Sequence, residues 1–399
     1  MATTTSLKPE SNRYPTLYTP GHIGGSSLKN RAIVAPMTRV SASEDGVPTE
    51  QMAQYYARFA QGDFALVITE GTYPDERSSQ GYGNQPGIAN DTQKDAWARV
   101  VDAVHKYQTP IFMQIMHAGA LVQRNRWKDD TVAPSKVQPL GEKMSMYGDE
   151  GEYAMPTALT ETGIFEVVDA FVDAARRARD AGFDGVEIHG ANGYLIDQFI
   201  TDYSNQRTDE YGGGIGNRLR VPRMIVRSVK DAMGEGFPVG IRLSQTKVNN
   251  MQHRWAGGED DAALIFRSLA EAGVDFIHIT GAGAVDPAFS NDGPSLAELA
   301  RQHGRVPVIG NGELEDPARA EALLASEHVQ FVSLARGALA NPDWPQKIAN
   351  HHDPRAFSTD MISPVATLDA QAEWEHDTGQ NNPLIRNATP SNQVKESTD

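Results

Sequence analysis

Short apolar stretches, rich in β-branched residues, recur along the chain between polar and turn-forming positions. There are eight of them, at residues 32–35, 64–68, 111–115, 185–188, 239–243, 276–279, 306–309 and 331–334. Because almost every position in each stretch is apolar, they predict strands that are covered on both faces. Strands of this kind belong to parallel sheets, whose connections cross the sheet as helices.

Amphipathic helices are predicted between these strands. The clearest covers residues 164–178, where apolar residues at 164, 167, 168 and 171 follow one helix face, with Thr160 or Thr162 as the N-cap. Similar patterns predict helices over 48–60, 91–106, 222–233, 260–272 and 317–325. Strand–helix units with right-handed crossovers leave a barrel or a doubly wound sheet, and eight units favour a single (β/α)8 TIM barrel of the α/β class.

The connection after strand three, residues 117–185, is the longest in the chain, and only its last part is helical. Since the loops that follow barrel strands lie on the catalytic face, we expect this insertion to cap the site. The organisation we predict is an N-terminal extension (1–16), a barrel (17–356) and a polar C-terminal tail (357–399) that is partly disordered or lies on the surface.

Composition narrows the class of protein. The 36 Lys and Arg against 52 Asp and Glu give a net charge of −16, which argues against nucleic acid or an anionic membrane as the partner. The absence of Cys excludes disulfides, cysteine nucleophiles and cysteine-ligated metal sites, and no other metal site is expected. No long apolar run or leader is evident, so a cytoplasmic enzyme is expected.

Polar residues and glycines stand at the ends of the predicted strands. They are Thr38 and Arg39 after strand one, Glu70 and Gly71 after strand two, Gln114 and His117 at strand three, His189, Asn192 and Tyr194 after strand four, Arg242 in strand five, Asn311 and Gly312 after strand seven, and Ala335 and Arg336 after strand eight. The carboxyl ends of barrel strands meet on one face, where barrel enzymes carry their active sites. We therefore expect these residues to converge.

Two kinds of chemistry are suggested by this set. His189 and Asn192 can both donate hydrogen bonds to one oxygen, and Tyr194 can deliver a proton, which suits polarising a carbonyl better than hydrolysis. After strands seven and eight, Gly312 and Arg336 fit a phosphate site, although a pair of ordinary glycine turns explains the glycines equally well.

The sequence resembles the old yellow enzyme family of FMN-dependent ene-reductases. The stretches that carry the resemblance are LKNR at 28–31, APMTR at 35–39, QIMHAG at 114–119, HGANGY at 189–194, NQRTDEYGG at 205–213 and NR at 217–218. The resemblance extends over residues 17–344, and the block at 189–218 is long and specific.

The resemblance implies that the barrel holds FMN as a tightly bound cofactor. The residues it assigns to the flavin are Ala35, Pro36, Met37, Thr38, Gly71, Gln114, Arg242, Asn311, Gly312, Ala335 and Arg336. Thr38 would contact the flavin carbonyl edge, Arg242 would lie near N1 and O2, and the last four residues would hold the phosphate.

The implied reaction has two half-reactions in one site. NAD(P)H would pass a hydride to the flavin and leave, and an activated alkene with a carbonyl or nitro group would then accept it from flavin N5. His189 and Asn192 would bind the substrate oxygen, and Tyr194 would protonate the neighbouring carbon. The family includes monomers and larger assemblies, so a homo-oligomer stays open.

Alternatives differ in the groups they need around the pocket. A flavin-dependent amine or N-methyl dehydrogenase would need aromatic or acidic groups that bind a cation. A flavin-free phosphate-binding barrel would need a base at a strand end, for which Glu70 and Glu187 are the candidates. The family often has Arg where this chain has Ala120, so the contacts of that Arg are in doubt here.

Overall fold

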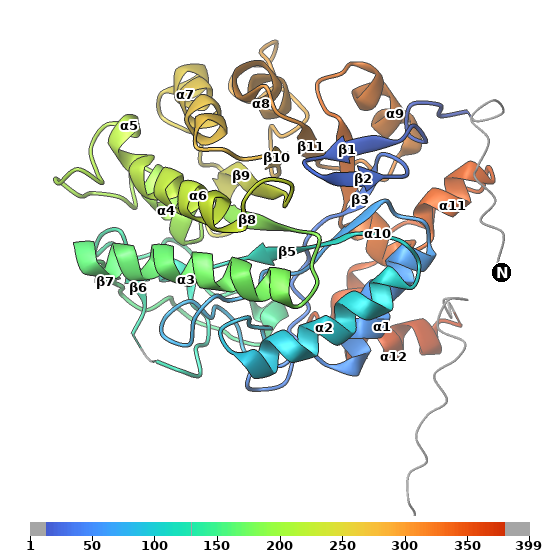
Figure 1. The fold of residues 1–399 in the computed structure, drawn as a ribbon, viewed down its shortest axis with the longest axis horizontal. Helices are drawn as coiled ribbons and strands as arrows, with labels where there is room; N and C mark the ends of the chain where they lie inside the picture. The colour runs from blue at the N-terminus through green and yellow to red at the C-terminus, as the bar shows by residue number, and fades with distance from the viewer. Residues whose placement is uncertain (1–12, 129, 380–399) are drawn as a thin grey trace, which may run out of the picture.

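The computed structural model describes residues 13–128 and 130–379. Its centre is a closed barrel of parallel strands in the order β10-β11-β12-β3-β4-β5-β8-β9. The strands are β3 (Ala32–Val34), β4 (Leu66–Ile68), β5 (Ile111–Ile115), β8 (Gly185–Asn192), β9 (Val239–Lys247), β10 (Phe276–Ile279), β11 (Val308–Asn311) and β12 (Phe331–Leu334). The predicted TIM barrel is therefore confirmed, with every predicted strand in it (Figure 1).

Helices surround the barrel (Figure 1). They are α1 (Glu50–Gln61), α2 (Asp91–His105), α3 (Glu161–Asp180), α4 (Leu195–Ile200), α5 (Ile215–Arg218), α6 (Arg220–Met233), α7 (Gly258–Glu271), α8 (Leu296–Gly304), α9 (Pro317–Ala325), α10 (Arg336–Ala340), α11 (Trp344–Ala349) and α12 (Leu368–Asp377). The predicted helices are all present, and Thr160 is the N-cap of α3, accepting a hydrogen bond from the Gly163 amide. Within the described residues, no helix is both long and apolar enough to cross a membrane.

The amino end of the barrel is closed by a hairpin. Strands β1 (Gly21–Ile23) and β2 (Ser26–Leu28) pair antiparallel. Ile23 and Leu28 pack in one buried cluster with Phe112, Phe276 and Phe331, which lie at or near the starts of their strands. Because this end is filled with apolar side chains, only the carboxyl end is left for a polar site.

Two strands are longer than the apolar pattern predicts. β8 continues to Asn192 and β9 to Lys247, so His189 and Asn192 lie inside a strand rather than after it. The two strands extend together because they pair along their whole length, with a shift of register between Gly190 and Asn192. Such a bulge re-aims the side chains that follow it.

The insertion after β5 carries two short strands, β6 (Val132–Ala133) and β7 (Thr157–Ala158), and two 3-10 turns, η2 (Gly119–Leu121) and η3 (Ser145–Tyr147). The tail carries a further 3-10 turn, η4 (Thr359–Ile362), and α12, which packs beside α1. The weak pattern of the tail did not predict this helix. Residues 380–399 lie outside the described residues.

Candidate active site

A cavity of about 230 Å³ opens at the carboxyl end of the barrel. Its walls come from strand ends, the insertion and the tail. Eleven of the predicted site residues line it: Pro36, Met37, Thr38, Gly71, Gln114, His189, Asn192, Tyr194, Arg242, Ala335 and Arg336. The other lining residues are Arg39, Met116, Met146, Tyr147, Val248, Leu339, Phe357, Ile362 and Ala366. The expectation that the strand-end residues converge is therefore confirmed for this set.

Three of the predicted cofactor residues do not line this cavity. Ala35 donates its backbone N–H to the Leu334 carbonyl, between β3 and β12. Asn311 is bonded inside the barrel, where its carboxamide oxygen accepts from Thr280 and its amide nitrogen donates to the Ser333 carbonyl. Gly312 follows with a φ of 146°, a conformation that favours glycine.

His189 is a buried, neutral imidazole. Burial and the nearby positive charge of Arg242 hold the pKa of His189 well below its usual range. Its Nδ1 accepts a hydrogen bond from the Ala191 backbone N–H at 3.4 Å, so the proton of the neutral ring is assigned to Nε2. The imidazole can therefore donate a hydrogen bond from Nε2 without carrying charge.

Asn192 and Tyr194 follow His189 through a tight turn. Asn192 has a φ of 63° and Gly193 a φ of 89°, both in the left-handed region. The Tyr194 ring packs edge-on against His189, with ring centroids 5.0 Å apart. The Tyr194 hydroxyl is hydrogen-bonded to that of Tyr82, a residue the sequence did not single out.

The Tyr194 phenol is held protonated. It is buried, and this burial raises its pKa well above the ordinary value, with a further rise from Tyr147. A phenol with so high a pKa stays neutral at physiological pH and can act as a proton donor.

Arg242 lies at the floor of the cavity, 5% exposed. Its Nη2 donates to Thr280 at 3.0 Å and to Asn311 at 3.3 Å. Its Nε is buried and has no hydrogen-bond partner among the described residues. An unpaired, charged donor beside an open cavity is costly, so this position calls for an acceptor from a bound group.

A polar chain fills the barrel interior below the cavity. Glu187 accepts from Gln114 at 2.8 Å and pairs with His278 Nδ1 at 2.7 Å, and His278 Nε2 contacts the Ser333 hydroxyl at 2.8 Å. His278 and Arg242 together lower the pKa of Glu187, although burial works against them. The carboxylate therefore offsets the charge of Arg242 and orients Gln114.

Neighbouring residues determine the surroundings of the remaining predicted flavin residues. Tyr147, from η3 of the insertion, lines the same cavity as Thr38, so the insertion contributes to the wall beside the end of β3. A Cβ on Gly71 would lie 2.5 Å from the Met116 sulfur, so only glycine fits there without displacing Met116. Ala335 is the N-cap residue of α10 and Arg336 its first residue.

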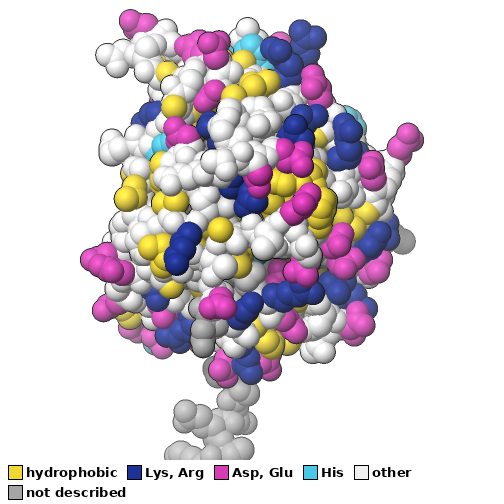
Figure 2. Space-filling view, turned by 90° about the vertical axis from the view of Figure 1, so that its left-hand side faces the viewer, with side chains coloured by type: hydrophobic (Ala, Val, Ile, Leu, Met, Phe, Trp, Pro, Cys, Tyr) yellow, Lys and Arg dark blue, Asp and Glu magenta, His cyan; other side chains and the backbone are white. Residues whose placement is uncertain are grey.

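Opposite charges alternate on the surface beside the insertion. Figure 2 shows the face that carries α5, β6 and β7, where Asp and Glu side chains are interspersed with Lys and Arg. The net charge of −16 is therefore not gathered into one acidic patch on this face.

Comparisons with known proteins agree on one family. Residues 16–354 match the model of the NADH:flavin oxidoreductase / NADH oxidase family. The chain is 35% identical to a probable flavin mononucleotide-dependent alkene reductase of Leishmania infantum, over 84% of this chain and 92% of that protein. It is 34% identical to an NADH oxidase of Thermoanaerobacter brockii, over 84% of this chain but only 50% of that longer protein.

The fold agrees as well. The structure of the old yellow enzyme homologue from Zymomonas mobilis superimposes with a TM-score of 0.78, at 34% identity over 86% of this chain and 94% of that one. Fold, family model and relatives all point to the resemblance carried by the strand-end motifs. The chain is an oxidoreductase that belongs to the NADH:flavin oxidoreductase / NADH oxidase family, as its resemblance to the old yellow enzymes predicted.

Proposed function

We propose that this protein uses FMN and a reduced nicotinamide to reduce electron-poor C=C bonds in α,β-unsaturated carbonyl or nitro compounds. The observation that carries the proposal is the make-up of the cavity wall. His189, Asn192 and Tyr194 supply neutral hydrogen-bond donors and Arg242 a cation, while no Asp, Glu or Lys is found among the described residues that line it. Such a wall stabilises an oxygen that gains negative charge during the reaction.

The residues present fit FMN. The unpaired Nε of Arg242 is a buried donor that an acceptor on the isoalloxazine edge would satisfy. Thr38, Gln114, Ala335 and Arg336 line the same cavity, and the Arg336 guanidinium would bind phosphate oxygens. When bound, FMN supplies the hydride chemistry between the nicotinamide and the alkene.

The protein's own residues then do three things. His189 and Asn192 bind the carbonyl or nitro oxygen of the substrate, which polarises the double bond and fixes its orientation. They also stabilise the negative charge that develops on this oxygen. Tyr194 donates its phenolic proton to the carbon next to the carbonyl group, and the high pKa of this phenol keeps the proton available.

The alternative of an amine or N-methyl dehydrogenase fits less well. An amine substrate is a cation, and a cation needs carboxylates or an uncharged aromatic cage. Tyr147 and Phe357 are aromatic members of the wall, but Arg242 and Arg336 line the same cavity and repel a cation.

The test is a visible absorption spectrum of the purified holoenzyme under anaerobic conditions. We expect a yellow protein that bleaches with NADPH or NADH and regains its colour with cyclohexenone. A yellow protein that ignores the enone but bleaches with an amine would favour the dehydrogenase. A colourless protein that takes up no added FMN would refute the proposal.

A further inference from the structure

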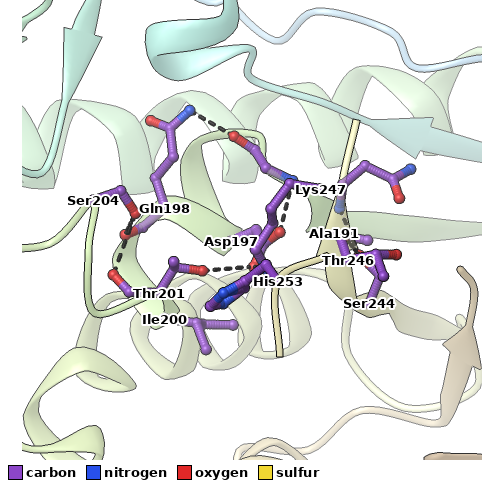
Figure 3. A network of polar contacts seen from close by, with 12 residues as sticks. Ala191, Asp197, Gln198, Ile200, Thr201, Ser204, Ser244, Thr246, Lys247 and His253 are labelled. Atoms are coloured by element: carbon purple, nitrogen blue, oxygen red, sulfur yellow. Dashed lines mark hydrogen bonds and ion pairs between the residues drawn. The ribbon is translucent and has the colours of Figure 1, made fainter. Parts of the chain in front are cut away.

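Two opposite charges are buried together beside the site. Asp197 in α4 and Lys247 at the end of β9 are each 1% exposed, and Lys247 Nζ lies 2.6 Å from Asp197 Oδ1. Figure 3 shows Asp197 between Lys247 and Thr201, whose hydroxyl donates to the same oxygen. Burial raises the pKa of Asp197 and lowers the pKa of Lys247, and their mutual attraction opposes both changes.

Stability alone does not explain such a pair. The desolvation of two charges consumes most of their attraction, and well-packed apolar residues of similar size are often as stable. Neither Asp197 nor Lys247 lines the cavity, so neither is placed to touch the substrate. The second oxygen of Asp197 indicates what the pair does.

Asp197 Oδ2 accepts the backbone N–H of Gly193 at 2.6 Å. The Gly193 carbonyl accepts a hydrogen bond from Gln198 Nε2 at 2.7 Å. The peptide groups on both sides of Gly193 are therefore held by side chains of α4. Gly193 is the residue between Asn192 and Tyr194, so its orientation sets the directions of both.

Lys247 reaches the same turn from the other side. It is the β9 residue paired with Asn192, and the next residue, Val248, donates its N–H to the Asn192 carbonyl at 3.1 Å. A Cβ on Gly193 would lie 3.2 Å from the Lys247 Cβ. The ion pair thus links β9 to α4 across the 192–194 turn. In this turn Asn192, which is not glycine, has a costly left-handed conformation.

We propose that the Asp197–Lys247 pair is a positioning pair, which holds the 192–194 turn in the conformation that directs Asn192 and Tyr194 at the substrate. The inference rests on the proposed function, because it is that function which gives these two residues their roles.

The main variant is Lys247→Met, which keeps the length of the side chain and removes its charge. Its matched control is Lys230→Met. Lys230 pairs with Asp275 at the opposite end of β9, where Asp275 accepts the Val239 N–H at 2.8 Å. Both changes remove a Lys–Asp ion pair tied to the same strand, but only the first reaches the turn.

The assay is anaerobic reoxidation of the reduced holoenzyme by cyclohexenone. We expect Lys247→Met to slow this step by about tenfold or more, since small misplacements of reacting groups have large effects on rate. In a Tyr194→Phe background the same change should cost much less, because the proton donor whose position it sets is already gone. Lys230→Met should leave the rate within about twofold of wild type in both backgrounds.

A second variant separates positioning from stability. Asp197→Asn with Lys247→Met leaves no buried charge, so we expect its melting temperature to recover while reoxidation stays slow. This double variant also serves if Lys247→Met alone does not fold. Recovery of both properties would mean that the pair acts only through stability, and would overturn the proposal.

A crystal structure of either variant gives a readout independent of activity. We expect Asn192 or Tyr194 to be displaced, and a 192–194 turn that superimposes on the wild-type turn would overturn the proposal for any substrate. If wild type itself fails to reduce cyclohexenone, the proposed function fails, and that result is distinct from a wild-type rate in Lys247→Met.

Discussion

Arg39 attaches the C-terminal segment to the barrel through three hydrogen bonds. It is 1% exposed, and its guanidinium donates to the carbonyls of Ala366 and Thr367, at 3.0 and 2.8 Å, and to the Gln371 side chain at 2.6 Å. The attached segment matters for the site, because Phe357, Ile362 and Ala366 form part of the cavity wall. Replacing Arg39 by Met keeps the apolar stem and removes all three hydrogen bonds.

These three hydrogen bonds set the free energy that Arg39 contributes to holding the segment closed. A hydrogen bond to a charged group contributes about 1.5–3 kcal/mol, and a buried group left without its partner costs about 1–3 kcal/mol. If the segment stayed closed, Arg39→Met would leave the Ala366 carbonyl and the Gln371 amide oxygen unpaired, and the Thr367 carbonyl with only the Gln371 N–H at 3.4 Å. Lifting the segment hydrates these groups and gives up the burial of Met361, Ala366 and Leu368 and the partial burial of Phe357, Ile362 and Trp374, which is a small part of the apolar core. We therefore expect local opening of residues 357–379 rather than global unfolding.

Hydrogen exchange read by mass spectrometry is the assay. Arg39→Met should lower the protection of α12 by at least about 2 kcal/mol, or roughly thirtyfold in exchange rate, with β5 and β8 unchanged. Arg58→Met is the matched control. Arg58 meets Glu375 of α12 through one contact of 3.4 Å, and its Nε and Nη2 have no partner among the described residues. Equal protection of α12 in wild type and Arg39→Met would refute the reasoning.

Three further predictions concern the site. Tyr194→Phe should slow alkene reduction by about 10²–10⁴-fold while flavin reduction by NAD(P)H stays nearly intact, as measured by stopped flow, and equal loss in both half-reactions would contradict its role. The pH profile of kcat/KM for the alkene should show no limb from His189 or Tyr194 between about pH 5.5 and 9.5. The direction of each pKa shift explains this. The lowered pKa of His189 keeps the imidazole neutral even when the pH falls below the ordinary pKa of histidine, and the raised pKa of Tyr194 keeps the phenol protonated as the pH rises. Arg242→Met should weaken FMN retention, measured as flavin released on dilution, because it removes the buried cation and the unpaired Nε donor at the cavity; unchanged retention would count against this role.

The sequence predicted the barrel because its pattern is local. Each strand is a short run of apolar residues, and this pattern does not depend on the conformation of the loops. The length of a strand was not predicted where pairing with its neighbour decides how far it extends. β8 and β9 pair with each other beyond their apolar stretches, and no pattern within 185–188 or 239–243 predicts this extension. Helix α8 was detectable, since Ser295 and Glu298 form a capping box three residues apart.

Residues of the cavity wall were predictable where they lie at a strand end, and not where tertiary contacts bring them to the cavity. The HGANGY motif directed attention to His189, Asn192 and Tyr194. Tyr82 and Lys247 carry no comparable motif, because each acts through one contact with a residue distant in sequence. The same holds for the cavity residues of the tail, whose place depends on the contacts that Arg39 makes.

The positions of the carboxylates separate the chemistries that the sequence left open. Burial raises the pKa of Glu70 to about 7, a value that would suit a catalytic base. Its oxygens, however, accept the Arg39 backbone N–H at 2.8 Å and the Tyr56 hydroxyl at 3.1 Å, and Glu70 does not line the cavity. Glu187 is equally committed, to Gln114 and His278.

A barrel that works by proton abstraction needs a base within hydrogen-bond reach of its substrate, and neither carboxylate meets that requirement. The cavity wall instead carries neutral hydrogen-bond donors and Arg242. Donors of this kind lower a barrier only when an oxygen gains negative charge in the transition state. Such a wall fits the proposed reduction, in which a reduced flavin held in the same cavity would supply the electrons.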